Sequence, residues 1–299
     1  MKPSWDLLPV TLTKKKCIFI LRKLPTIPMI ELSLHDVQII SAALLKYRGL
    51  DMSHYLDYPL KRAYEKAMEV TGIHDADEVR HRLKHDKNYA EEFLSLIAFG
   101  SSEMFRDASF WTYLRDYIMP SLVHQVKEKV RVWFPYVASG DELYSFLIMV
   151  HEMGWNNQVE TEASVPLKSM IQKVKENAFP QHKLKISMDN YHQYQGRYSL
   201  AIYLQQKEGK TFRNPTLIEK VKFSVHPFPL IEPERQYHLI LFRNKMIYLN
   251  QTMQDRIVSI IHKALYPAGL LAVGVKENMG NYSLLFKPLY REENIFIKI

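Results

Sequence analysis

The sequence predicts an α/β protein in which an all-helical N-terminal domain, residues 30–127, precedes a domain of alternating strands and helices, residues 128–299. Three observations predict this. Apolar residues recur at spacings of three and four from Leu34 onward, with almost no glycine, as in packed helices. After Lys129 the pattern changes to short apolar runs separated by helical stretches, which is typical of βαβ units. Residues 183–220 form a connection too long for an ordinary loop, so a small inserted β-subdomain is expected there.

Residues 1–29 have the pattern of an appendage, because no helical period is sustained and four prolines interrupt the segment: Pro3, Pro9, Pro25 and Pro28. We expect this segment to be loosely attached and Met29 to be the natural start. Deleting residues 1–28 should leave the melting temperature almost unchanged, since the segment offers no clear packing face. A large fall in a calorimetric melting temperature would contradict this.

The α/β domain shows five strand-sized apolar runs and three amphipathic stretches. Strands are expected at 130–134, 159–163, 221–225, 237–242 and 270–275. Helices are expected at 142–153, 168–176 and 251–265. Residues 282–298 alternate between apolar and polar, as in a closing antiparallel hairpin.

The composition is that of an ordinary globular protein, with 47% hydrophobic and 24% charged residues among 299. Cys17 is the single cysteine, which excludes an internal disulfide framework and a cysteine-based zinc site, and no metal is expected. A reducing cytoplasm fits this cysteine count. The longest apolar run near the N-terminus, residues 17–21, is too short to span a bilayer, so we expect a soluble, cytoplasmic protein with no membrane insertion.

The formal net charge of +8 favours an acidic partner, which could be a nucleic acid, an anionic membrane surface or a glutamate-rich protein. The basic residues are scattered in short runs, and no zinc-finger or RNA-binding motif accompanies them. Solvated surface is therefore the better interpretation of each run, and nucleic acid is the least favoured partner.

Two motifs lie in the helical half. Residues 47–55 read YRGLDMSHY and are followed by LKR at 60–62, a pattern that alone would fit any capped pair of helices. Residues 100–107 read GSSEMFRD. An isolated Phe-Arg-Asp usually places a surface arginine, here Arg106, in an ion pair with the neighbouring acid, Asp107.

A third motif spans the first expected strand and the start of the helix after it, where residues 131–145 read RVWFPYVASGDELYS. A glycine at such a turn lets the backbone approach a ligand, and a carboxylate can meet an ammonium group. Gly140 and Glu142 supply these two features. The simpler interpretation is a helix N-terminus whose acids complement the helix dipole.

A fourth motif follows the expected strand at 237–242. Residues 237–249 read YHLILFRNKMIYL, followed by QDR at 254–256, LYPAG at 265–269 and GVKEN at 274–278. The simpler interpretation of Tyr248 is a buried tyrosine that hydrogen-bonds a backbone carbonyl.

Taken in order, the four motifs resemble those of the CheR-type methyltransferases that esterify receptor glutamates, and the resemblance covers roughly residues 30–299. It implies that the second domain is a Rossmann-like S-adenosylmethionine-dependent methyltransferase domain. It also implies an acidic helical receptor-like protein as partner, held against the N-terminal helices, and docking of a receptor tail on the inserted subdomain.

The resemblance assigns roles to individual residues. Arg106 and Tyr248 fall on catalytic positions that orient the acceptor. The cofactor-binding positions are Ser102, Tyr136, Ser139, Gly140, Glu142, Arg243 and Asn244. Tyr136 replaces a small residue of the family, so its ring is expected to narrow the pocket.

Two departures concern the nucleoside end of the cofactor. The family's ribose-binding aspartate corresponds to Val165 in this chain, unless a shifted strand register brings Glu160 or Glu162 there. The asparagine that faces adenine is replaced by Pro227. The sequence therefore leaves two main hypotheses, an active glutamate methyltransferase and a catalytically degenerate fold that serves as a signalling interaction module. A methyltransferase for another acceptor, such as a small acid, is a third.

Overall fold

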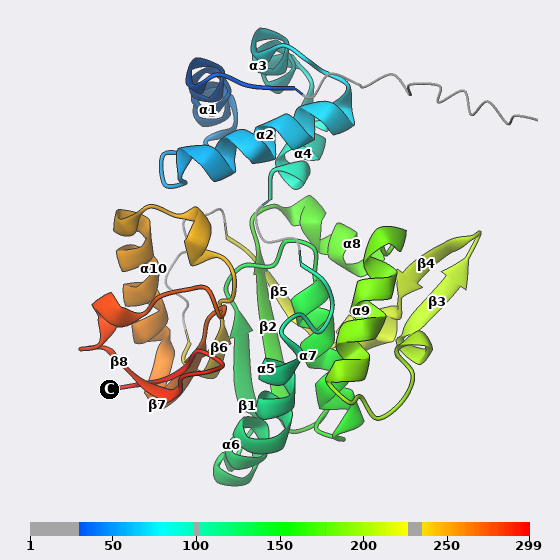
Figure 1. Cartoon of the computed structure of the whole chain (residues 1–299), viewed down its shortest axis with the longest axis vertical. Coiled ribbons are helices and arrows are strands. Elements are labelled where there is room, and N and C mark those ends of the chain that lie inside the picture. Colours follow the sequence, from blue (N-terminus) through cyan, green and yellow to red (C-terminus); the bar gives the residue numbers. More distant parts are fainter. Residues whose placement is uncertain (1–29, 99–101, 177, 227–234) are drawn as a thin grey trace, which may run out of the picture.

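A computed structural model describes residues 30–98, 102–176, 178–226 and 235–299 (Figure 1). The expectations for residues 1–29 and for Pro227 lie outside these described residues, as do Gly100 and Ser101 of the second motif.

The N-terminal half of the chain begins with four helices that share one hydrophobic core. They are α1 (Leu34–Arg48), α2 (Asp57–Thr71), α3 (Ala76–His85) and α4 (Lys87–Leu96). A capping box between Ser33 and Asp36 starts α1, because each side chain accepts a hydrogen bond from the other residue's backbone N–H. The helix ends at Gly49, whose φ of 67° is left-handed and favours glycine.

Three further helical segments precede the first strand: α5 (Ala108–Tyr113), the π-helix η1 (Leu114–Ile118) and α6 (Met119–Gln125). Their buried residues, including Phe110 and Leu114, belong to the core of the α/β part and not to that of α1–α4. Buried residues up to Ile97 therefore belong to the core of α1–α4, and those from Met104 onward belong to the core of the α/β part. The change from helices to strands falls after residue 125. The predicted domain boundary at 127 follows the change in secondary structure.

The α/β part is built on a seven-stranded sheet in the order β5-β2-β1-β6-β7-β9-β8. The strands are β1 (Val130–Phe134), β2 (Val159–Val165), β5 (Lys222–Val225), β6 (Tyr237–Leu241), β7 (Leu265–Ala272), β8 (Phe286–Tyr290) and β9 (Ile295–Lys298). The first five in the order are parallel, and β9 runs antiparallel to both β7 and β8, which confirms the expected C-terminal hairpin. The expected strand at 270–275 is shifted, because β7 begins at Leu265, which pairs with Tyr237 before an irregularity in the register.

The helices of this sheet agree with the prediction to within a residue: α7 (Asp141–Glu152), α8 (Lys168–Glu176) and α10 (Gln251–Ala264). The insertion differs, because it opens with a helix, α9 (Gln181–Gln193), that the sequence did not predict. This helix buries only Ser187 and Tyr191, so its apolar period is too weak to recognise. After η2 (Leu200–Tyr203), strands β3 (Leu204–Lys207) and β4 (Lys210–Arg213) form the small antiparallel sheet, and η3 (Pro215–Ile218) leads back to β5.

The four-helix part lies over one edge of the large sheet (Figure 1). Backbone hydrogen bonds join the two: Leu56 N–H donates to the Tyr248 carbonyl oxygen at 2.9 Å, and Asn250 N–H donates to the His54 carbonyl oxygen at 3.0 Å. Tyr248 ends the short helix η4 (Met246–Tyr248) that follows β6. The helices therefore cover the carboxyl ends of the central strands. Within the described ranges, no helix combines the length and apolar character needed to cross a membrane.

Candidate active site

The strand order reverses at β1, which has β2 on one side and β6 on the other. In open parallel sheets, ligands bind beyond the carboxyl ends of the strands at such a switch point. The segments that leave the carboxyl ends of β1 and β6 contain the third and fourth sequence motifs, so both motifs lie at this position.

The turn between β1 and α7 depends on Gly140. Its φ of 82° is left-handed, and an added Cβ would lie 2.8 Å from Val174 Cγ1, so a larger residue would be both strained and crowded. The turn brings Asp141 and Glu142 into the first turn of α7, where the helix dipole stabilises negative charge.

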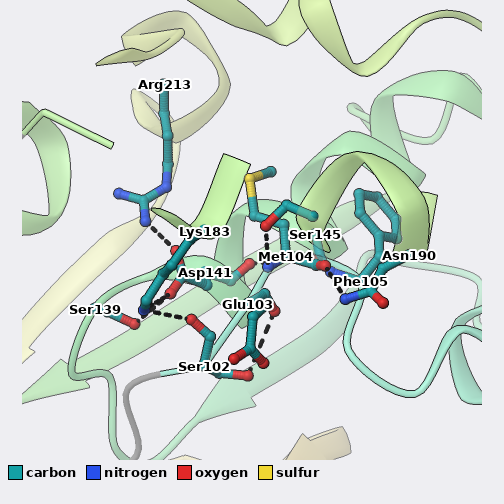
Figure 2. A network of polar contacts seen from close by, with 11 residues as sticks. Ser102, Glu103, Met104, Phe105, Ser139, Asp141, Ser145, Lys183, Asn190 and Arg213 are labelled. Carbon is teal, nitrogen blue, oxygen red and sulfur yellow. Dashed lines mark hydrogen bonds and ion pairs between the residues drawn. The ribbon is translucent and has the colours of Figure 1, made fainter. Parts of the chain in front are cut away.

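Asp141 is only 1% exposed, and other residues of the protein supply hydrogen-bond donors to its carboxylate (Figure 2). Its carboxylate accepts hydrogen bonds from Ser139 Oγ at 2.7 Å, from Lys183 Nζ at 3.1 Å and from the Arg213 guanidinium. Asp141 thereby ties the inserted segment to the start of α7. Of the two acids in this turn, Glu142 is the candidate for contact with a ligand.

Arg243, at the end of β6, joins three of the sequence motifs. It is 1% exposed, and its Nη1 donates to Glu142 Oε1 at 3.2 Å while its Nη2 donates to Asp107 Oδ2 at 2.7 Å. Its guanidinium also lies over the Phe110 ring, 3.8 Å from the centroid. Asp107, which the simpler interpretation pairs with Arg106, is held by Arg243 instead.

Arg106 lies between two non-glycine residues with left-handed backbones, Phe105 at φ 55° and Asp107 at φ 58°. Such conformations are uncommon and persist only where the surroundings hold them. Here Ser145 Oγ accepts from Phe105 N–H at 2.8 Å, and Asn190 Nδ2 donates to the Met104 carbonyl oxygen at 3.0 Å (Figure 2). The loop that presents Arg106 is therefore anchored to α7 and α9.

Glu277 organises the turn after β6. Its carboxylate accepts backbone N–H groups of Asn244 at 2.8 Å, Lys245 at 2.7 Å, Met246 at 2.6 Å and Gly274 at 2.5 Å. Burial raises the pKa of Glu277, and the four backbone hydrogen bonds act in the opposite direction. This carboxylate fixes the left-handed backbone of Asn244 at φ 56°.

Asn244 packs tightly against Gly274, where an added Cβ would lie 2.4 Å from Asn244 Oδ1. Lys245, which follows it, is buried, with its Nζ 5.7 Å from the centroid of the Tyr136 ring. Burial lowers the pKa of the Lys245 ammonium, while the nearby carboxylates of Glu142 and Glu277 raise it.

One small cavity collects most of the predicted cofactor residues. Its lining includes Ser102, Tyr136, Ser139, Gly140, Glu142 and Lys245. The cavity volume is about 10 Å³, roughly the space that one water molecule requires. The Tyr136 ring and the Lys245 side chain both line this small space.

The ribose position offers no carboxylate at the end of β2. Val165 is 1% exposed there, and Pro166 and Leu167 follow it. Glu160 and Glu162, the alternatives for this position, both pair with Arg235, and Glu162 also accepts from the Tyr237 hydroxyl at 2.6 Å. Among the described residues, the features that suit S-adenosylmethionine are the Gly140 turn and Glu142, which the resemblance assigns to the amino-acid end of the cofactor.

Cofactor affinity should consequently be weak. Losing a ribose carboxylate removes a hydrogen bond to a charged group, worth roughly 1.5–3 kcal/mol, and losing the adenine amide adds to this. At about 1.4 kcal/mol per tenfold, we expect at least a hundredfold weaker binding than at an intact site. Calorimetric titration with S-adenosylhomocysteine checks this, and a submicromolar dissociation constant would contradict it.

Neither residue of the predicted catalytic pair lines the small cavity. Arg106 precedes Asp107 of the Arg243 cluster and lies close enough to Lys245 to lower the pKa of that ammonium. Tyr248 is half-buried in η4, at the contact with the four-helix part. The contacts of Asp107, Asp141 and Glu277 were not predicted from the sequence, although each of these acids lies within one of the four motifs.

Comparison with known proteins identifies the family. Residues 100–294 match the family described as CheR methyltransferase, SAM binding domain. A methyltransferase named Cher3 from Pseudomonas putida is 26% identical over 268 residues, which is 88% of this chain and 97% of the relative. A chemotaxis protein methyltransferase from Listeria monocytogenes is 23% identical and covers 78% of this chain and 86% of its own. A biofilm formation methyltransferase, WspC, from Pseudomonas aeruginosa is 24% identical, covering 78% of this chain and 55% of the relative.

The matched family domain spans about two thirds of the chain and includes the Arg106 loop, the Gly140 turn and the Arg243 segment. It favours the enzyme over the interaction module among the hypotheses that the sequence left open. The chain belongs to the CheR methyltransferase family, and it is a methyltransferase whose cofactor is S-adenosylmethionine.

Proposed function

We propose that this protein transfers methyl groups to glutamate carboxylates of a receptor-like protein. The observation that supports the proposal is the pairing of Arg243 with both Glu142 and Asp107, which links the loop that carries Arg106 to the Gly140 turn. Relatives named as chemotaxis protein methyltransferases support a receptor as the acceptor, and the +8 net charge supports an acidic one.

A glutamate side chain with an ordinary pKa of about 4.3 is ionised near neutral pH, so its oxygen needs no strong general base. When bound, S-adenosylmethionine supplies a methyl group on a sulfonium sulfur. The Gly140 turn and Glu142 would hold this cofactor, which would supply its methyl carbon to the acceptor oxygen and keep the electron pair of its carbon–sulfur bond.

The chain's own contribution is alignment of the acceptor and exclusion of water. Arg106, on its strained and anchored loop, would hold the acceptor carboxylate through one oxygen. The Tyr248 hydroxyl would orient the other side of the reacting centre from η4. Glu142 would meet the ammonium group of the cofactor, with Arg243 keeping that carboxylate in place.

The inserted hairpin offers a docking edge for the same partner. Strand β3 has three exposed residues in four and pairs only with β4 among the strands of the described chain, so an extended segment could add to it. The helices of the partner would lie against the N-terminal helices, in a reducing cytoplasm.

The proposal is tested with the purified chain, radiolabelled S-adenosylmethionine and a helical receptor peptide that contains glutamates. The expected product is a methyl ester, which mild alkali cleaves to release labelled methanol. A peptide with every glutamate replaced by glutamine is the matched control. Alkali-stable label, or no transfer to the glutamate peptide, would contradict the proposal.

Replacing Glu142 by glutamine should weaken cofactor binding before it affects transfer. The neutral amide cannot offer an ionised acceptor to the cofactor ammonium, so we expect about a tenfold to hundredfold rise in the dissociation constant. At saturating cofactor the transfer rate should largely recover. An unchanged dissociation constant in calorimetry would remove Glu142 from the cofactor site.

A further inference from the structure

A second, larger cavity adjoins the cofactor turn and is strongly basic. Its volume is about 330 Å³, within the range of about 300–1,000 Å³ found for ligand pockets. Both halves of the molecule line it: Lys66 comes from α2, Lys173 from α8, and Lys183 and Arg213 from the insertion. Ser139 of the Gly140 turn lines both this cavity and the small one.

The charge of this basic cavity is not balanced by its own lining. Its lining residues include four lysine or arginine cations and His182 but no carboxylate among the described residues. Asp141, which does not line the cavity, pairs with Lys183 and Arg213, so among the described residues the four cations exceed this one carboxylate by three charges. Charges of one sign gathered in a cleft raise the local concentration of ligands of the other sign.

Arg213 gives a second, independent indication of a ligand. It is only 5% exposed, and its Nε–H has no hydrogen-bond partner within the described part of the chain. Buried donors are almost always paired, so this one points to an acceptor from outside the chain. Its guanidinium carbon lies 4.8 Å from the centroid of the Phe179 ring and 5.2 Å from that of the Tyr144 ring. A fixed guanidinium is well suited to a planar carboxylate.

We propose that the basic cavity binds an acidic peptide segment and seats at least one of its carboxylates against Arg213. The inference rests on the proposed function, because a peptide whose target glutamate reaches the cofactor turn would carry its neighbouring acids to Ser139 and the basic cavity. The site selects acceptors whose methylated glutamate is flanked by other acidic residues.

Binding is measured by fluorescence anisotropy with the full chain, without cofactor, using a labelled peptide of alternating glutamate and alanine. The variant Lys173→Ala/His182→Ala removes two partly or fully exposed cavity residues and leaves Arg213 and Asp141 in place. Lys175→Ala is the matched control, because Lys175 lies on the same helix but outside the cavity and over the Phe223 ring. Equal melting temperatures establish that both variants fold.

We expect the double variant to weaken peptide binding about tenfold and the control to stay within about twofold of the parent. A glutamine version of the peptide should not bind. Equal affinities for the double variant and the control, or equal binding of the glutamine peptide, would overturn the proposal. Binding of citrate or inorganic phosphate with the same dependence on Lys173, but no binding of the peptide, would also overturn it in favour of a small anion.

Different results would contradict the proposed glutamate acceptor and the proposed peptide site in the basic cavity. Peptide binding that depends on Lys173 without any methyl transfer contradicts the proposed acceptor but not the basic cavity. Transfer to receptor glutamates that is unaffected by the double variant contradicts the basic cavity alone.

Discussion

Replacing Arg106 by alanine should lower methyl transfer to a glutamate acceptor by about a hundredfold or more, while cofactor binding changes by less than about threefold. Removing one preorganised donor at a reacting centre typically has an effect of this size on the rate. A contact that is stronger in the transition state than in the ground state lowers the activation barrier. A contact that is equally strong in both states lowers only the Michaelis constant. Single-turnover transfer at saturating cofactor, alongside calorimetric titration, separates the two quantities.

The matched control is Arg82→Ala, since Arg82 pairs with Glu78 on the surface of α3, away from the sheet. It should leave both quantities unchanged. Tyr248→Phe, which removes only a hydroxyl, should also lower the rate more than the cofactor affinity. If Arg106→Ala weakens cofactor binding and rate equally, Arg106 contacts the cofactor and not the acceptor.

Replacing Glu277 by glutamine should destabilise the fold by about 3 kcal/mol. The carboxylate accepts four backbone N–H groups, and the single amide oxygen of glutamine cannot accept all of them. A buried donor left without a partner costs about 1–3 kcal/mol. Denaturant unfolding followed by circular dichroism measures the loss.

Glu78→Gln is the control for this substitution, because Glu78 is an exposed acid in an ion pair and should contribute less than about 1 kcal/mol. Asn244 and Lys245 would lose their backbone anchor in Glu277→Gln, so cofactor binding should also weaken. A variant with unchanged unfolding midpoint would mean that water or a rearranged turn satisfies these N–H groups.

The sequence predicted the fold well where burial leaves a strong pattern. Strand β1 is buried on both faces, and its apolar run coincides with the strand from Val130 to Phe134. The same criterion failed for α9, which buries two residues in thirteen and is held by polar contacts such as that of Asn190 with Met104. Apolar spacing cannot reveal a helix that is fixed mainly through its polar atoms.

The sequence predicted which residues belong to the site, but not which of them form ion pairs with one another. Motif order placed Arg243 and Glu142 at the cofactor, yet nothing in their spacing showed that they pair with each other across 101 residues. Asp141 was the acid expected to complement a helix dipole, and the structure commits it to Lys183 and Arg213 from the insertion. Such long-range pairing depends on the folded topology, which local patterns do not record.

Hydrogen bonds join the four-helix part to Tyr248 and Asn250 in the segment that follows β6. Asn250 Nδ2 donates to the Ser53 carbonyl oxygen at 2.9 Å, beside the bonds that Leu56 and Asn250 N–H groups make across the same seam. A hinge motion that lifts the four helices must either break these bonds or pull Tyr248 away with them. Under the proposed role of Tyr248, opening and catalytic alignment would be two readouts of one equilibrium, and a substitution that breaks these hydrogen bonds would lower the fraction of molecules ready to react.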